Sequence, residues 1–248
     1  PGGGLTLTGN FVVDGGTIKL DGNYPTGTAN VALGNEALDS GSLSGSHNVA
    51  VGTSALTNNT SGIQNIAVGF EALGDNTTGC FNTGVGHGAL ALNTTTKCNT
   101  AIGYASLNNN VASNNTAVGK SSLQANTSGA DNTAVGNNAL KANTSGGCNI
   151  AMGNGSLFTN TTGICNSAVG LDALFFNTTG DNNVAFGSLA LCKNTTADNN
   201  TSVGFKSLRA NTTGADNTAM GCGALTTNTT ASNNTAVGFQ SLTANTTG

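Results

Sequence analysis

The residue types that most often carry chemistry are sparse in this chain and do not converge on one stretch of sequence. Its two histidines, His47 and His87, stand in unrelated contexts, and His87 follows a repeated glycine where other copies carry Phe70, Tyr104 or Lys120. Catalysis requires a nucleophile, a base and an oxyanion donor that converge in one pocket. We therefore predict no active site, no cofactor and no enzymatic activity.

Candidate metal ligands are equally scattered. Four aspartates occur singly in turn segments: Asp131, Asp181, Asp198 and Asp216. The Gly-Gly-x-Gly-x-Asp pattern of a calcium-binding β-roll is missing, and no set of cysteines and histidines has the spacing of a zinc site. The sequence predicts no bound metal, and we interpret these aspartates as solvated turn residues.

The six cysteines are Cys80, Cys98, Cys148, Cys165, Cys192 and Cys222. Cys148 and Cys165 hold the same place in consecutive copies of a repeat, so they should stack about one strand spacing apart, near the range that a disulfide tolerates. Cys80 and Cys98 are adjacent in the same way, offset by one residue. Two interpretations stay open: disulfides in these two pairs, or small unpaired thiols.

Asn-x-Thr/Ser sequons recur at an equivalent position in eleven of the thirteen repeats. Their asparagines are Asn59, Asn76, Asn93, Asn126, Asn143, Asn160, Asn177, Asn194, Asn211, Asn228 and Asn245. A stripe of acceptors could carry glycans if the source glycosylates its secreted proteins. Asn and Thr also favour turns, and stacked Asn side chains can form a hydrogen-bonded ladder. We favour the turn and ladder interpretation.

A short repeat must position all of these residues. A glycine preceded by Asn-x-Ala-x returns about every 17 residues, and we number each unit from this glycine as position 0. The thirteen glycines are Gly34, Gly52, Gly69, Gly86, Gly103, Gly119, Gly136, Gly153, Gly170, Gly187, Gly204, Gly221 and Gly238. Glycine permits a sharp bend, which suits the corner of a coil. A fixed short period predicts units that bury apolar surface only by stacking on their neighbours.

Within each unit, position +3 is Ala or Ser and position +4 is always Leu. We predict that the stacked leucines form the core spine: Leu38, Leu56, Leu73, Leu90, Leu107, Leu123, Leu140, Leu157, Leu174, Leu191, Leu208, Leu225 and Leu242. Positions −3 and −1 are mostly β-branched or apolar and share one face of a strand, which we assign to a core column. Position −2, nearly always Ala, lies on the other face, where it would let several chains pack closely. A second short strand and an Asn-Thr-Thr-Gly turn should complete the unit.

The amino-acid composition of the chain excludes several classes of protein. Charged residues make up 7% of the chain, the net charge is −4 and only seven Lys and Arg are scattered along it. This excludes the basic footprint of a nucleic-acid binder. No apolar stretch is long enough to span a membrane. Recurrent glycine and the lack of a 3.6-residue period exclude helices.

We therefore predict an all-β fold, a repetitive parallel β-solenoid or β-roll of about 17 residues per coil. Residues 1–29 form an N-terminal β-segment and linker, and residues 30–248 form the array of thirteen repeats. At about 4.8 Å per coil the rod is roughly 60 Å long. One coil of this size encloses a thin core, so we expect several chains to pack together, as a homotrimer. Because the chain starts without Met and stops inside a turn, we expect a segment of a longer protein.

The units at 30, 48, 65, 149 and 183, written Asn-Val/Ile-Ala-aliphatic or Phe-Gly, resemble the coil motif of trimeric autotransporter adhesin heads. The longer unit with Ala-Leu and Asn-Thr-Thr-Gly, together with the stretch from Gly16 to Pro25, is similar to repeats of bacteriophage tail fibres. The resemblance implies a trimeric fibre that projects from a surface and contacts a host. Its place would be extracellular or on a virion, with any receptor bound by residues outside this segment.

Three functional hypotheses remain. The first is a structural shaft of a phage tail fibre or similar appendage, and the second is a self-assembling extracellular filament or adhesin stalk, glycosylated at the sequons. The third is an ice-binding solenoid, because regular threonine arrays on a flat face can bind ice. We disfavour the third, since the threonines at position −3 alternate with Val and Ile, as expected of a core column.

Overall fold

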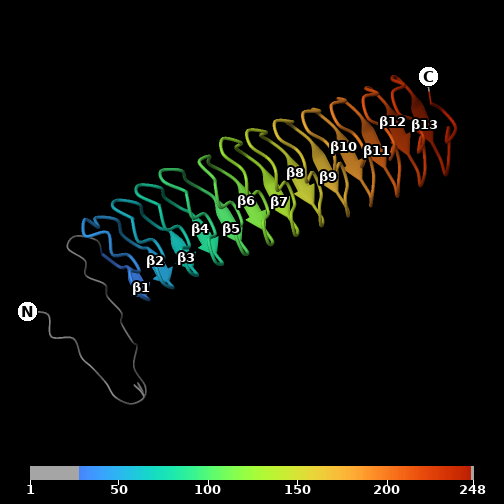
Figure 1. Cartoon of the computed structure of the whole chain (residues 1–248). Helices are drawn as coiled ribbons and strands as arrows, with labels where there is room; N and C mark the ends of the chain where they lie inside the picture. Colours follow the sequence, from blue (N-terminus) through green and yellow to red (C-terminus); the bar gives the residue numbers. More distant parts are fainter. Residues whose placement is uncertain (1–27, 247–248) are drawn as a thin grey trace, which may run out of the picture.

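The structure is a computed structural model that describes residues 28–246, and the predicted N-terminal β-segment lies almost wholly outside them. The described residues form a straight rod of stacked coils (Figure 1). Each coil contributes one three-residue strand. The strands are β1 Val31–Leu33, β2 Val49–Val51, β3 Ile66–Val68, β4 Thr83–Val85, β5 Thr100–Ile102, β6 Thr116–Val118, β7 Thr133–Val135, β8 Ile150–Met152, β9 Ser167–Val169, β10 Val184–Phe186, β11 Thr201–Val203, β12 Thr218–Met220 and β13 Thr235–Val237.

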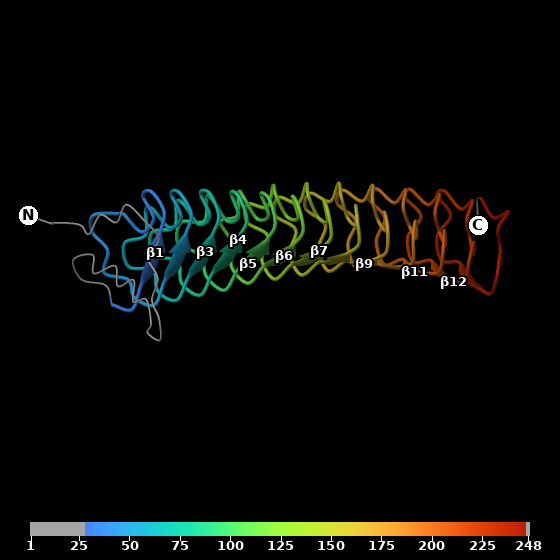
Figure 2. The same ribbon diagram turned by 90° about the horizontal axis from the view of Figure 1, so that it is seen from below.

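The thirteen strands form one parallel sheet in sequence order, β1 to β13. Equivalent residues of neighbouring coils pair directly, as Ala50 pairs with Ala67. The strands follow one another along a single side of the rod, which Figure 2 shows from a second direction. The prediction of a parallel β-solenoid with coils of about 17 residues is therefore confirmed.

The glycine at position 0 forms the corner after each strand. All thirteen have φ between 125° and 141°, a region that is essentially restricted to glycine. A Cβ built on Gly136 would lie 2.5 Å from the carbonyl oxygen of Gly153 in the next coil. The corner therefore requires glycine both for its dihedral angle and for the close approach of the next backbone.

The predicted second strand is wrong. Positions +1 to +6 form turns, because the residue at +2 and the leucine at +4 both have positive φ. The thirteen leucines have φ between 47° and 54°, which is unusual for a bulky residue. Backbone hydrogen bonds still join the coils here, as from Leu56 N–H to Ala72 O at 3.1 Å. The turn segments thus stack in register without being extended.

The interior contains the leucine column and the small residues at −2 and +3. Twelve of the thirteen predicted spine leucines are fully buried, and Leu242, in the last coil described, is half exposed. A Cβ built on Gly84, at position −2, would lie 3.4 Å from Leu73 Cγ. Only a small side chain fits at −2, because the leucine packs directly against the strand.

The predicted facing of the strands is therefore reversed. Position −2 points inward, whereas positions −3 and −1 point outward and are partly or largely exposed, as in the burial pattern of β8. The bulky residues are not the core column, and Ala at −2 makes no contact between chains. The small residue is inside because the interior of each coil is thin.

Candidate interaction surface

Two columns of asparagine run along the buried interior. At position −4, the Asn65 backbone N–H donates to Asn48 Oδ1 at 2.9 Å, and Asn65 Nδ2 donates to Gly79 O at 2.8 Å. At position +7, Asn76 Nδ2 donates to Asn59 Oδ1 at 2.8 Å and to the same Gly79 carbonyl at 3.1 Å. Each coil is closed by these shared acceptors, and each column links one coil to the next.

These contacts correct the glycosylation alternative. The asparagines of ten sequons are fully buried: Asn59, Asn76, Asn93, Asn126, Asn143, Asn160, Asn177, Asn194, Asn211 and Asn228. Asn245 is partly buried and also donates to Asn228 Oδ1, at 3.5 Å. Because the Nδ2 that would carry the glycan is the donor of the ladder, a glycan does not fit these positions in the folded rod. The ladder interpretation holds instead.

All six cysteines are free thiols in the structure. Cys148 and Cys165 are exposed at equivalent places of consecutive coils, and their backbone N–H groups donate to Ala130 O and Gly147 O. Cys98 is exposed and donates its N–H to Cys80 O at 3.2 Å. The predicted pairs are neighbours along the rod, but neither disulfide is formed. Cys222 is exposed and Cys192 is buried.

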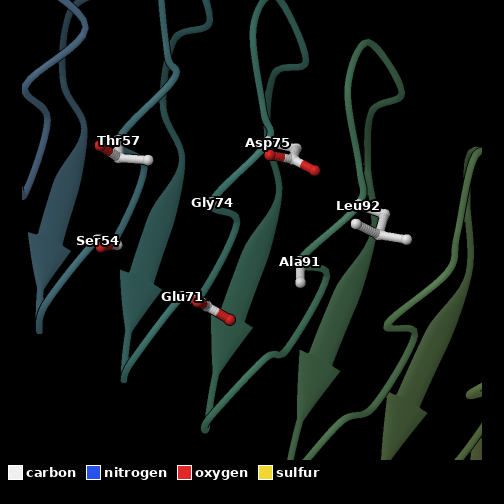
Figure 3. Close-up of a pocket in the computed structure, with 7 residues that line it drawn as sticks. All are labelled: Ser54, Thr57, Glu71, Gly74, Asp75, Ala91 and Leu92. Carbon is white, nitrogen blue, oxygen red and sulfur yellow. The ribbon is translucent and has the colours of Figure 1, made fainter.

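One hollow of about 310 Å³ lies on the side of the rod away from the sheet (Figure 3). It is lined by Ser54, Thr57, Glu71, Gly74, Asp75, Ala91 and Leu92. Asp75 accepts a hydrogen bond from Asn58 Nδ2 at 3.1 Å, so one carboxylate is already engaged. The hollow brings two carboxylates near hydroxyl groups. The Ser54 hydroxyl donates to Glu36 Oε2 of the preceding coil at 3.2 Å.

The two histidines that the sequence singled out stay apart, whereas Asp181, Asp198 and Asp216 stack in consecutive coils. His87 lies between Phe70 and Tyr104, with ring centroids 5.0 and 5.3 Å away, and His47 is exposed on another part of the coil. Asp181 and Asp198 side chains accept backbone N–H groups of the preceding coil at 2.8 and 2.7 Å. Among residues 28–246, no three His, Cys, Asp or Glu side chains are grouped as metal ligands.

Searches of protein-family models, of curated proteins and of solved structures each gave no match to this chain. Within the described part there is also no helix that could cross a membrane. The geometry of the rod is therefore the guide to its function.

The outer face of the sheet is the surface that leaves the most large apolar side chains exposed. The −1 column presents an apolar side chain from every coil, whereas position −3 is Val or Ile in five coils and Thr or Ser in eight. Many of the apolar side chains are more than a third exposed. Among them are Leu33, Ile66, Ile102, Val135, Ile150, Met152, Phe186, Met220 and Val237. The flanking +1 column adds exposed Phe70, Tyr104, Leu171, Phe205 and Phe239. The described −3 and −1 residues include no charged side chain.

Sequence reasoning assigned these columns to the core and so missed this surface. One signal could have found it: the −2 column is invariably small, whereas the −1 column ranges from Val to Phe. A thin close-packed interior tolerates little variation in volume. The variable column is the one that points outward.

Proposed function

We propose that the chain is a structural shaft whose copies pack against one another through the outer face of the sheet. The assembly is a homotrimer, and its role is that of a tail-fibre shaft or a similar surface appendage that holds a host-binding tip away from a particle. The observation that carries this proposal is the uncharged outer face of the sheet, which has an apolar residue at position −1 in every coil along the rod.

The size of this face supports contact between copies. Thirteen coils at about 4.8 Å and a width of roughly 10 Å give an uncharged strip on the order of 600 Å², in which the whole −1 column and five of the −3 residues are apolar. Typical monomers expose patches of at most about 300–600 Å². With the +1 column the strip approaches the roughly 800 Å² that each partner buries in a stable complex. A third copy lets each chain cover its strip without leaving an edge of apolar residues in water.

The hydrogen bonds inside the rod support a mechanical role. Every coil is joined to the next by strand pairing, by turn backbone hydrogen bonds and by the −4 asparagine ladder, and most coils are joined by the +7 ladder as well. In a linear array of this kind stability is the sum of coil and nearest-neighbour terms, so bending or opening the rod breaks many contacts at once. A rod with repeated internal bonds suits a spacer of fixed length.

Paired substitutions on two faces of the same coils test the proposal. Val118→Lys with Val135→Lys places charges on the outer sheet face, and Ala125→Lys with Ala142→Lys places them on the opposite side. Because all four side chains lie outside the core, we expect both variants to keep the wild-type circular dichroism spectrum. Sedimentation velocity should give a trimer for wild type and for the Ala variant, and a monomer for the Val variant. A trimeric Val variant, or a monomeric wild type, would reject this interface.

A second candidate, ice binding, is favoured by one observation. Position −3 faces outward, so the argument that placed its threonines in a core fails. Thr83, Thr100, Thr116 and Thr133 stand in four successive coils beside Val or Ile at −1. The same coils carry His87, Tyr104 and Lys120 at +1, which interrupt a flat surface. Thermal hysteresis of the purified chain would support ice binding over the shaft, and its absence would remove this candidate.

In the filament hypothesis, copies of the chain also pack through the outer face of the sheet. A filament would differ from the shaft in that copies add without closing at three. Burial of the asparagines of the +7 sequons removes glycosylation of that stripe from this hypothesis. An open series of masses in native mass spectrometry, in place of one trimer, would favour it.

A further inference from the structure

Large and small side chains alternate along the outer face in the last six coils described. At position −1 the large residues are Met152, Phe186 and Met220, in every second coil. In the coils between them, position −1 is Val and position +1 is large instead: Leu171, Phe205 and Phe239. In the coils with a large residue at −1, position +1 holds Asn154, Ser188 or Cys222. Each coil thus presents one large and one smaller side chain, in alternating order.

Other residues of the same chain do not bury these large apolar side chains. Phe186 and Leu171 are 52% and 51% exposed, and Phe205 is 48% exposed, although each has coils stacked on both sides. The −1 and +1 residues flank the corner glycine, so both columns lie on the outside of the coil along the same edge of the sheet. The alternation therefore shapes a surface of protrusions and hollows that only another molecule can fill.

We infer that this alternation fixes the axial register between copies of the chain. The inference rests on the proposed packing through the sheet face. In a parallel assembly with no axial shift, the large +1 residue of one chain meets Val at −1 of its neighbour. One coil further along, the large −1 residue meets the neighbour's small +1 residue. A slip of one coil would set large against large and small against small, which overpacks one level and leaves a cavity at the next.

The array needs such a device because its other features repeat in every coil. The strands, the leucine spine and the −4 asparagine column recur in all thirteen coils, so a slip by one coil would leave them nearly unchanged. A nearly uniform apolar strip specifies register weakly. The alternation makes odd and even coils different. The copies should therefore assemble with their coils aligned, because an axial shift of one coil between neighbours is excluded.

A double-substitution cycle in one coil tests the inference. Ser188→Phe puts two large residues at one level, Phe186→Val leaves two small ones, and the combination restores one of each in the order of the adjacent coils. We expect each single variant to raise the concentration of half-assembly, on the order of tenfold for Ser188→Phe. The combined variant should return to within about threefold of wild type. Phe176→Val, an equally exposed phenylalanine away from the sheet, should leave assembly unchanged.

The readouts separate this inference from the proposed function. Circular dichroism should be unchanged in all variants, because the substituted side chains lie outside the core. A wild-type trimer whose single-variant effects add in the double variant would overturn the register inference and leave the shaft standing. A wild-type monomer would overturn both.

Discussion

Asn76 Nδ2 donates to Asn59 Oδ1 in the preceding coil at 2.8 Å and to Gly79 O in its own coil at 3.1 Å. The same side chain thus closes one coil and fastens it to another. Its own Oδ1 accepts from Asn93 Nδ2 at 3.0 Å, so the pattern continues along the rod. The polar groups of this column are fully buried yet satisfied, which makes asparagine the residue that the position requires.

Removal of one ladder member should destabilise the rod. Asn143 donates to Asn126 Oδ1 at 2.7 Å and to Gly146 O at 2.9 Å, and it accepts from Asn160 Nδ2 at 2.9 Å. Asn143→Ala leaves buried partners unpaired, so we expect a loss of about 2–4 kcal/mol in unfolding free energy. Asn109→Ala, at an exposed asparagine, is the control. Equal melting temperatures for the two variants would contradict the ladder's role.

A second prediction concerns the leucine spine. Leu140 is fully buried, and Leu140→Ala should cost about 2–5 kcal/mol through lost contacts and a residual cavity. Leu140→Asp should cost more, because it buries an unpaired charge. Changes at position +1, such as Phe70→Ala or Lys120→Ala, should leave the stability of the isolated chain nearly unchanged. The check is thermal unfolding by circular dichroism, and an unmoved transition for Leu140→Asp would show that Leu140 is not core.

A third prediction concerns the corner glycine at position 0. Gly136→Ala meets the carbonyl carbon and oxygen of Gly153 and holds alanine at φ near 141°. We expect a loss of about 3 kcal/mol or more. Gly74→Ala is the matched control, since its Cβ would meet nothing closer than 3.4 Å and its φ is not in the positive region. Chemical denaturation of both variants compares them, and a Gly136→Ala midpoint equal to that of Gly74→Ala would refute the strain argument.

The buried thiol makes a fourth prediction. Burial raises the pKa of Cys192 above its ordinary value of 9.0, and the nearby Asp172 carboxylate raises it further. Since the thiolate is the reactive form, Cys192 should be alkylated more slowly than exposed Cys148 and Cys165 in the folded protein. Peptide mapping after timed alkylation measures this order. Alkylation of Cys192 as fast as Cys165 would contradict its burial.

The raised pKa of Cys192 also predicts how the stability of the fold changes with pH. Because the folded pKa of Cys192 is raised, its contribution is fully present below pH 9.0 and is lost as the pH rises through the folded pKa. The wild type should therefore lose stability over that alkaline range more steeply than Cys192→Ala. Parallel slopes of melting temperature against pH would count against the assignment.

Much of the fold follows from the sequence, because a strict period fixes which residues stack. The glycine at 0 marks the corner and the leucine at +4 marks the spine, and both columns have these places in the structure. The buried asparagine columns agree with the favoured ladder interpretation.

Local rules fail at two places for physical reasons. Leucine is not expected at positive φ, yet stacking of thirteen equivalent turns holds Leu140 and its counterparts there. Alternation of large and small residues in a strand does not say which face is inside. The bulky −1 residues point outward, because Leu73 and its counterparts already fill the thin interior against the −2 column. The sequence signal for the outer face was the variation in size at −1 beside the invariably small −2 column.

The measurement that tests the central claim most directly is native mass spectrometry of the assembled protein, made beside the Val118→Lys, Val135→Lys variant. The shaft account predicts a single species of three chains for wild type and one chain for the variant. A wild-type protein that stays a single chain with its apolar face in water would contradict it.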